Sequence, residues 1–238
     1  MEKTVEKISD ECRRKFGKNL RSLILYGSWV KGTAHRDSDI DLLAVFNRVG
    51  KGTRKLMDEV LRSHRSGEAA NIIPTSLRDF RKERIPLFTA VKNEGKIIYG
   101  NADLSVNPQP PAVKYADFFK ASRKLETGKV KMAEEILEKH PDYGGSADIC
   151  FVAAKHAVQA ALAMKGEGYS SKVKILLPLA KKHLGREVAD NLQKLFILYV
   201  KSEYGMKSLN RRETRLAIQY AKKVFAAYEF EAIFRTRS

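Results

Sequence analysis

The sequence predicts an α/β domain with a small mixed sheet, followed by an all-α, up-and-down helical bundle. Three observations lead to this prediction. Short apolar runs of strand length alternate with helical periodicity up to about residue 100. Three prolines then fall within residues 108–111, and every later segment has helical spacing. We therefore expect an N-terminal domain at 1–104, a Pro-rich linker at 105–113 and a helical domain at 114–238.

The elements of the first domain follow from periodicity and from stop signals. Apolar residues at helical spacing predict helices, and short apolar or alternating runs predict strands. Pro74 is expected to end one strand, Ser76 to cap a helix and Gly95 to stop another. In order, we expect a helix (2–18), two strands (21–26 and 39–46), a helix (53–66) with Leu56, Val60 and Leu61 inward, a strand (69–75), two short helices and a strand (96–100).

The second domain shows only helical periodicity. Its segments are separated by the short breaks TG, PDYGG, GEG and LG, which contain the residues that commonly end helices. The expected helices are 114–127, 129–139, 147–165, 171–184, 187–204 and 211–235.

Composition narrows the class of partner. The net charge of +17 is spread over the chain, with 21 basic and 13 acidic residues up to residue 100 and 24 and 15 beyond it. Such an excess favours polyanions, nucleotides or nucleic acid among them, although it also keeps a protein soluble. The sequence contains no run of about 18 apolar residues, so we expect no membrane-spanning helix. Cys12 and Cys150 lack metal or disulfide spacing, so we expect reduced thiols and a cytoplasmic protein.

Two carboxylates interrupt the second expected strand. Asp39 and Asp41 lie two residues apart, so they point to the same face and repel each other unless a cation lies between them. Carboxylate oxygens of this kind suit Mg²⁺ or Mn²⁺ together with substrate phosphates. Upstream, Gly27 and Ser28 follow a strand and precede an expected short helix, a place where backbone N–H groups bind anions.

The stretch GSWVKGTAHRDSDIDLLAVF resembles the minimal nucleotidyltransferases of the DNA polymerase β-like superfamily, whose signature is Gly-Ser, ten residues, then Asp-x-Asp. The resemblance covers about residues 20–100. It implies Mg²⁺-dependent transfer of an NMP from an NTP such as ATP to an acceptor hydroxyl, with Asp39 and Asp41 as catalytic metal ligands. Lys31 and Arg36, in the loop between the two parts of the signature, are candidates for contact with the triphosphate or for solvated loop charges.

The same resemblance implies a third carboxylate that acts as base on a later strand. Asn71 stands where that acid is expected, and a neutral amide cannot take the acceptor's proton. Glu68, a few residues earlier, is the candidate substitute, or else a solvated loop residue. This departure questions turnover more than NTP binding.

The stretch DICFVAAKHAVQAALAMKGEGYSSK resembles HEPN domains, which occur beside minimal nucleotidyltransferases as toxin–antitoxin pairs. Many HEPN domains are ribonucleases with an arginine shortly before a histidine. None of the five histidines here has an arginine five to seven residues before it, so that motif is absent. His156 is expected to be a packing or capping side chain. The bundle then serves substrate binding or forms a homodimer through its last helix.

Two functions remain from the sequence. The first is a nucleotidyltransferase whose acceptor is a protein, as in antitoxins that AMPylate, a small molecule, as in aminoglycoside nucleotidyltransferases, or RNA. Polycationic aminoglycosides fit a protein of charge +17 poorly. The second is a catalytically weak protein that binds nucleotide or nucleic acid, which Asn71 favours and the intact Gly27, Ser28, Asp39 and Asp41 oppose.

Overall fold

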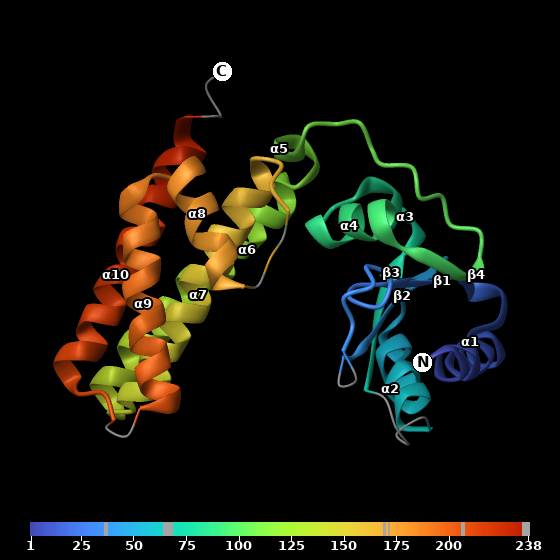
Figure 1. The fold of residues 1–238 in the computed structure, drawn as a ribbon, viewed down its shortest axis with the longest axis horizontal. Helices are drawn as coiled ribbons and strands as arrows, with labels where there is room; N and C mark the ends of the chain where they lie inside the picture. The colour runs from blue at the N-terminus through green and yellow to red at the C-terminus, as the bar shows by residue number, and fades with distance from the viewer. Residues whose placement is uncertain (36–37, 64–68, 169, 171, 206–207, 235–238) are drawn as a thin grey trace. The chain divides into compact units, whose positions relative to one another are not determined.

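The computed structural model describes residues 1–35, 38–63, 69–168, 170, 172–205 and 208–234, with the side chains of 228–234 excepted. The chain forms two compact units, Met1–Gln109 and Pro110–Ser238. Figure 1 shows a sheet with helices in the first unit and helices alone in the second. This is the predicted fold class.

The sheet has four strands in the order β3-β2-β1-β4. Strand β1 (Leu20–Tyr26) pairs antiparallel with both β2 (Ile40–Phe46) and β4 (Lys96–Gly100). Strand β3 (Ala70–Ser76) pairs parallel with β2 and forms one edge. The sheet is therefore mixed, as expected.

Helices cover both faces of the sheet. Helices α1 (Glu2–Phe16), followed by the 3₁₀ turn η1 (Gly17–Asn19), and α2 (Lys51–Ser63) pack on the face that contains Ile40 and Leu42. Helices α3 (Leu77–Lys82) and α4 (Pro86–Glu94) pack on the opposite face against Leu43 and Val45. Strand alternation thus places odd-numbered residues of β2, including Asp41, on the α3–α4 face.

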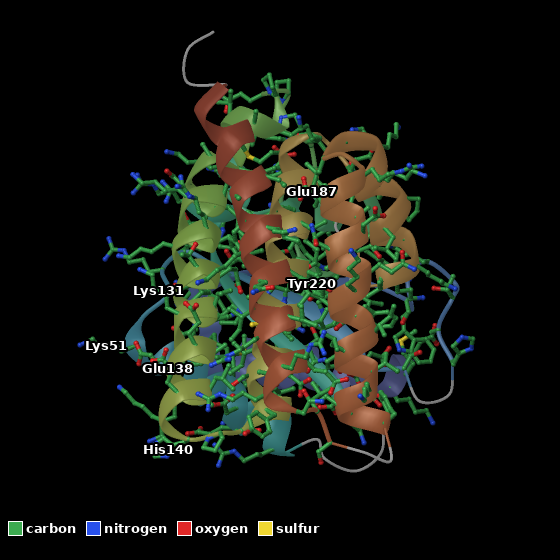
Figure 2. All side chains as sticks on the ribbon, turned by 90° about the vertical axis from the view of Figure 1, so that its left-hand side faces the viewer. Lys51, Lys131, Glu138, His140, Glu187 and Tyr220 are labelled. Carbon is green, nitrogen blue, oxygen red and sulfur yellow. The ribbon has the colours of Figure 1, made fainter. Side chains whose placement is uncertain are left out.

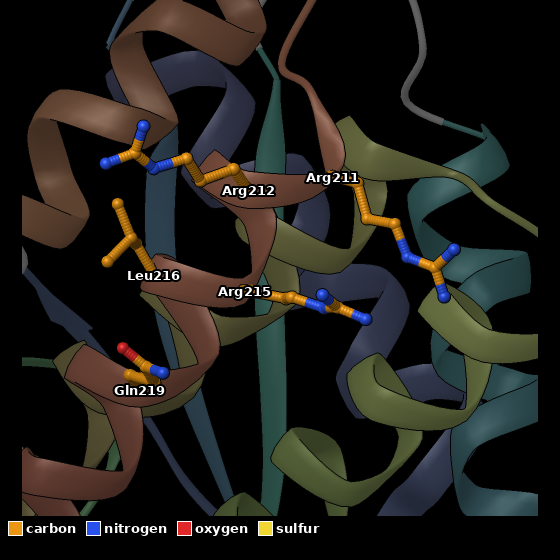
Figure 3. Close-up of a pocket in the computed structure, with 5 residues that line it drawn as sticks. All are labelled: Arg211, Arg212, Arg215, Leu216 and Gln219. Atoms are coloured by element: carbon orange, nitrogen blue, oxygen red, sulfur yellow. The ribbon is translucent and has the colours of Figure 1, made fainter.

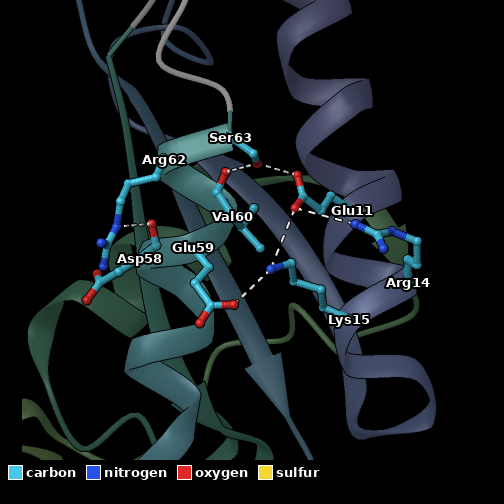
Figure 4. Close-up of polar contacts among 8 residues, drawn as sticks. All are labelled: Glu11, Arg14, Lys15, Asp58, Glu59, Val60, Arg62 and Ser63. Carbon is cyan, nitrogen blue, oxygen red and sulfur yellow. Dashed lines mark hydrogen bonds and ion pairs between the residues drawn. The ribbon is translucent and has the colours of Figure 1, made fainter.

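Polar contacts join α1 to α2 at the edge of their apolar packing (Figure 4). Lys15 Nζ lies 3.0 Å from Glu59 Oε2, and Ser63 Oγ donates to Glu11 Oε2 at 2.5 Å. Helix α1 precedes the β1–β2 pair in the sequence and α2 follows it. The contacts therefore hold together the two helices that cover one face of the sheet.

Two details of this unit differ from expectation, and a third is confirmed. Pro74 lies within β3 rather than ending it, because β3 is an edge strand and needs its N–H groups on one side only. In α2 the buried residues are Thr53, Met57 and Val60, whereas Leu56 is only half-buried. The Ser76 cap is confirmed, since its hydroxyl accepts from Asp79 N.

The segment after β4 is held by a buried ion pair. Glu83, fully buried at the end of α3, accepts from Lys92 Nζ at 2.9 Å and from Thr89 Oγ1 at 2.8 Å. It also accepts from the backbone N–H of Asn107, and Lys92 donates to the carbonyl of Ser105 at 2.7 Å. Part of the predicted linker is therefore bound to the first unit.

The second unit consists of helices packed around one apolar core, to which α7 contributes the largest share. Lys131 and Glu138 lie along the outside of α6, and Tyr220 lies between α9 and α10 (Figure 2). The helices are α5 (Pro111–Lys114), α6 (Ala116–Lys139), α7 (Tyr143–Met164), α8 (Val173–His183), α9 (Arg186–Tyr204) and α10 (Arg211–Phe234).

Two predicted breaks are wrong. Helix α6 continues through Thr127 and exposed Gly128, because one glycine costs only about 1 kcal/mol and the packing of α6 on α7 offsets it. Helix α7 begins at Tyr143 instead of 147, since Asp142 caps it by accepting from the N–H of Gly145. The short α5 also falls in a segment that was expected to be irregular.

Among the described residues, α7 is the one helix long and apolar enough to cross a membrane. Two thirds of its apolar window is buried inside the unit. Packing against the neighbouring helices therefore accounts for its composition.

We expect Glu83→Gln to lower the free energy of unfolding of the first unit by about 3–5 kcal/mol, because it leaves the Lys92 ammonium buried without its counter-charge. Urea titration of the full chain measures this change. The matched control is Glu94→Gln on α4, which breaks a half-exposed pair with Lys31 and should cost less than about 1 kcal/mol. Equal losses in the two variants would contradict a special role for the buried pair.

Candidate functional site

The turn after β1 brings the chain back across the end of the sheet. Gly27 has φ +81°, its carbonyl accepts from Lys31 N at 3.2 Å, and Ser28 O accepts from Thr33 N at 3.0 Å. These bonds form a tight turn over 27–32 and not the expected short helix. The left-handed conformation at Gly27 and Gly32 diverts the chain before a helix can propagate.

Gly27 packs directly against Asp41. A Cβ atom at position 27 would lie 2.6 Å from Asp41 Oδ2, closer than real Cβ contacts allow. The position therefore needs glycine for two independent reasons, the positive φ and the contact with the carboxylate. Tyr26, the residue before the turn, is the direct partner of Asp41 in the β1–β2 pairing.

Asp39 and Asp41 lie on the α3–α4 face, at an end of the sheet that those helices leave open. Ile40 between them is fully buried on the other face. Asp39 and Asn71 are exposed and Asp41 is half-buried, and Ile73 on β3 is 37% exposed. The two carboxylates thus replace apolar side chains only where the sheet has no helix above it.

Asn71 completes a polar triad with these carboxylates. Its strand β3 runs parallel to β2 and places Asn71 directly opposite Asp41. Its Nδ2 donates to Asp39 Oδ2 at 3.3 Å, and its amide is close enough to Asp41 to act against the rise in the pKa of that carboxyl. A neutral amide on the neighbouring strand therefore lies beside both carboxylates.

The site is negatively charged, and among the described residues no cationic side chain pairs with its carboxylates. Burial raises the pKa of Asp41, the hydrogen bond from Asn71 opposes this rise, and the charge of Asp39 adds to it. Burial and the charge of Asp41 likewise raise the pKa of Tyr26 to about 12. Within the described part of the chain, neither Asp39 nor Asp41 forms an ion pair with Lys or Arg. The uncompensated pair would be stabilised by a bound cation.

The donor set fits a hard divalent cation. Two carboxylates with an adjacent amide offer oxygen ligands only, which suits Mg²⁺ or Mn²⁺ and leaves most of the coordination shell to water and phosphate. Among the described residues no cluster of three or more His, Cys, Asp or Glu could hold a metal. An all-protein metal cage is therefore not built into the described part of the chain.

The remaining predicted site residues have different outcomes. Lys31 Nζ lies 2.8 Å from Glu94 Oε2 at the end of α4, and both side chains are about half-exposed. Arg36 and Glu68 lie outside the described residues. Gly27, Ser28, Asp39 and Asp41 do come from segments that the sheet brings together.

Two residues were not identified from the sequence: Tyr26, which lies beside Asp41, and Glu94, which pairs with Lys31. Tyr26 could have been found, because it ends the strand before Gly27 and alternation places it on the face of Asp41 once antiparallel pairing is assumed. Glu94 has no such signal, since its approach to Lys31 depends on where α4 packs.

In the helical unit, His156 binds a buried carboxylate, as expected for a packing residue. Its Nδ1 lies 3.3 Å from Oε1 of Glu126, which is only 3% exposed and also pairs with Lys129. Burial acts to raise the pKa of Glu126, but the contacts with His156 and Lys129 outweigh it and lower the pKa below its usual value. These contacts join α6 to α7.

Comparison with known proteins identifies both units. The family described as "Nucleotidyltransferase domain" matches residues 5–93, and the family described as "HEPN domain" matches 118–231. A protein of Methanocaldococcus jannaschii, provisionally named a protein adenylyltransferase, is 34% identical over 108 residues, which cover 41% of this chain and 74% of that protein.

Two solved structures are also similar. The structure of spectinomycin adenyltransferase AAD(9) from Enterococcus faecialis with ATP and spectinomycin covers 94% of this chain and 99% of its own, with a TM-score of 0.51 and 12% identity. That likeness shows a shared fold. A toxin–antitoxin structure with AMP-PNP covers 56% of this chain and 98% of its own at 19% identity, and its TM-score of 0.32 is too low to support an argument.

We expect Gly27→Ala to weaken binding of Mg²⁺–ATP by at least about tenfold, because its methyl group collides with Asp41 Oδ2 and displaces the carboxylate. Gly32→Ala is the matched control, since Gly32 also has positive φ but has no atom within 4 Å of an added Cβ. Calorimetric titration of both variants separates the collision from backbone strain. An equal loss of Mg²⁺–ATP affinity in both variants would show that the Gly27–Asp41 contact does not account for the effect.

Proposed function

This chain belongs to the nucleotidyltransferase family, with a HEPN domain after the transferase domain, and we propose that it transfers the AMP part of ATP to an acceptor hydroxyl. The observation that supports this proposal is the pair Asp39 and Asp41 on an open end of the sheet, packed against the turn at Gly27. ATP is preferred as donor because the relative and the structure with the same fold are both named for adenylyl transfer.

Asp39 and Asp41 would hold the metal. The half-buried Asp41 is kept in position by Gly27 on one side and Asn71 on the other, so its carboxylate needs little reorganisation on binding. A bound Mg²⁺ ion supplies neutralisation of charge on the transferred phosphate. Because the two carboxylates repel each other, binding also relieves a cost that the folded chain otherwise carries.

The turn at 27–32 would hold the triphosphate. Gly27 lets the backbone approach a ligand closely, and Ser28 offers its N–H and hydroxyl beside it. Lys31 is paired with Glu94, but both groups are about half-exposed, so exchange of the carboxylate for a phosphate costs little. Arg36 remains a further candidate from the sequence.

A protein side chain is the acceptor that fits best. The relative is named for protein adenylylation, which favours an acceptor hydroxyl on a polypeptide, as in AMPylating antitoxins. The structure with the same fold is an enzyme named for spectinomycin, so a small-molecule acceptor is the main competitor. The net charge of +17 makes a cationic small molecule a poor acceptor, because the protein repels such a molecule at long range.

A second function is favoured by one observation. Asn71 occupies the position beside both carboxylates and cannot accept a proton. The site therefore has the groups needed to bind Mg²⁺–ATP but lacks a general base at this position. A protein that binds Mg²⁺–ATP and transfers slowly, or that only binds nucleotide, agrees with this geometry.

The proposal is tested by incubating the full chain with Mg²⁺ and ATP labelled at the α-phosphate, alone and with cell extract. We expect labelled protein with the wild type and none with Asp39→Asn or Asp41→Asn, because each change removes a metal ligand. Both variants should also unfold at a higher temperature than the wild type without Mg²⁺, since each removes one of two repelling charges. Unchanged Mg²⁺–ATP affinity in both variants would exclude this site.

The role of Asn71 is tested by restoring an acid. Asn71→Asp should raise the transfer rate, because a positioned general base contributes about 10²–10⁴-fold. If Glu68 already acts as the base, Glu68→Gln should remove most of the activity and Asn71→Asp should change little. Transfer rates of both variants with one acceptor decide between these accounts. No change in either variant would place the base elsewhere.

A further inference from the structure

The start of α10 carries positive charge that its surroundings do not neutralise. Arg211, Arg212 and Arg215 are all exposed, and within the described residues none of them forms an ion pair. The nearest carboxylate in sequence, Glu213, is already engaged. It lies 2.5 Å from Lys201 Nζ and accepts from the backbone N–H of Asn210 at 3.1 Å.

The three arginines line a hollow of about 400 Å³ together with Leu216 and Gln219. Figure 3 shows Arg211 and Arg215 extending to one side of α10 and Arg212 extending to the other. The hollow therefore offers guanidinium groups around a small apolar and amide surface, and no acidic side chain lines it.

This arrangement is electrostatically unfavourable for the helix itself. Arg211 and Arg215 are one turn apart, and like charges at that spacing destabilise a helix. Positive charge in the first turns also opposes the helix macrodipole, which favours acidic residues there. Three arginines therefore lie at positions where positive charge lowers the stability of the helix.

The backbone under these arginines is firmly held. Asn210 Oδ1 accepts from Glu213 N at 3.0 Å, which completes a reciprocal cap. Fully buried Thr214 donates to the carbonyl of Tyr143 at the start of α7 and can donate alternatively to that of Asn210. The cap satisfies the N–H of Glu213 and fixes the first turn of α10, so the three guanidinium groups extend from a backbone that is held in place.

Two other hollows with basic residues have different surroundings. In the hollow of about 350 Å³ beside α9, three basic residues face Glu187 and Asp190. In the hollow of about 530 Å³ between α1 and α2, Lys15 is paired with Glu59. Acidic side chains therefore share the hollow beside α9 with the basic ones, and Lys15 has a carboxylate partner, whereas the five residues that line the hollow at the start of α10 include three arginines and no acid.

We propose that the start of α10 binds the phosphate backbone of a nucleic acid. Guanidinium groups are planar forks that match phosphate oxygens, and they keep their charge at every physiological pH. A strand that crosses the start of α10 meets arginines on both sides of the helix, and Leu216 and Gln219 lie beneath a base. The net charge of +17 draws a polyanion to the protein at long range.

The test is fluorescence-anisotropy titration of the full chain with a labelled single-stranded RNA about 12 nucleotides long, and with the same DNA sequence. Changing Arg211, Arg212 and Arg215 to Gln should weaken RNA binding by at least about tenfold. It should also reduce the slope of log affinity against log salt concentration by about two, as expected for three lost phosphate contacts. Mg²⁺–ATP binding should stay unchanged, because these residues lie outside the proposed transfer site.

The matched control changes Arg186, Lys194 and Lys223 to Gln, which removes the same charge from a hollow of the same unit that is also lined by Glu187 and Asp190. It should weaken RNA binding by less than about threefold. Changing the three arginines to Lys keeps the charge, and a partial loss of affinity there would support recognition by the guanidinium fork. Equal losses in the Gln variant and the control, no RNA or DNA binding by the wild type, or equal affinity for poly-glutamate would each overturn the proposal.

Discussion

The contact between Gly27 and Asp41 is the constraint on which the rest of the candidate site depends. The backbone of the turn approaches so closely that a single methyl group would lie 2.6 Å from the carboxylate. This approach fixes the path of the turn and half-buries Asp41, and burial in turn raises the pKa of that carboxyl. The turn proposed to bind the triphosphate and the carboxylate proposed to bind the metal are therefore one packed unit, and neither can be moved without the other.

Asn71 is the residue on which the proposed balance between nucleotide binding and catalysis depends. An aspartate beside Asp39 and Asp41 would add a third negative charge to a site that already lacks a cation among the described residues. The amide instead donates a hydrogen bond to Asp39 and lowers the free-energy cost of holding the two carboxylates together. The chain thus gains a more stable site without ligand and loses a group that could take a proton. Because Asn71 stabilises the site but cannot act as a base, both a transferase and a nucleotide-binding protein agree with this geometry.

Charge has different roles in different parts of the chain. The buried pair of Glu83 and Lys92 stabilises the first unit and holds the segment that follows β4. The half-exposed pair of Lys31 and Glu94 is weak enough to exchange with a ligand. At the start of α10 the arginines have no such partners among the described residues, and their charge is directed outward. Net charge alone suggests polyanions, and the three arginines that line one hollow support the place of binding that we propose.

The sequence by itself determined the fold class, the alternation that places both carboxylates on one face, and the two family resemblances, because these depend on spacing within short segments. Most of the candidate site, from Gly27 to Asp41, was predictable for the same reason. Only the tertiary structure decided that Asn71 lies opposite Asp41 and bonds Asp39, since this needs the parallel register of β2 and β3. It also decided that α6 continues through Gly128 and that Lys31 meets Glu94. These features rest on packing between distant segments, and local propensity contains no information about such contacts.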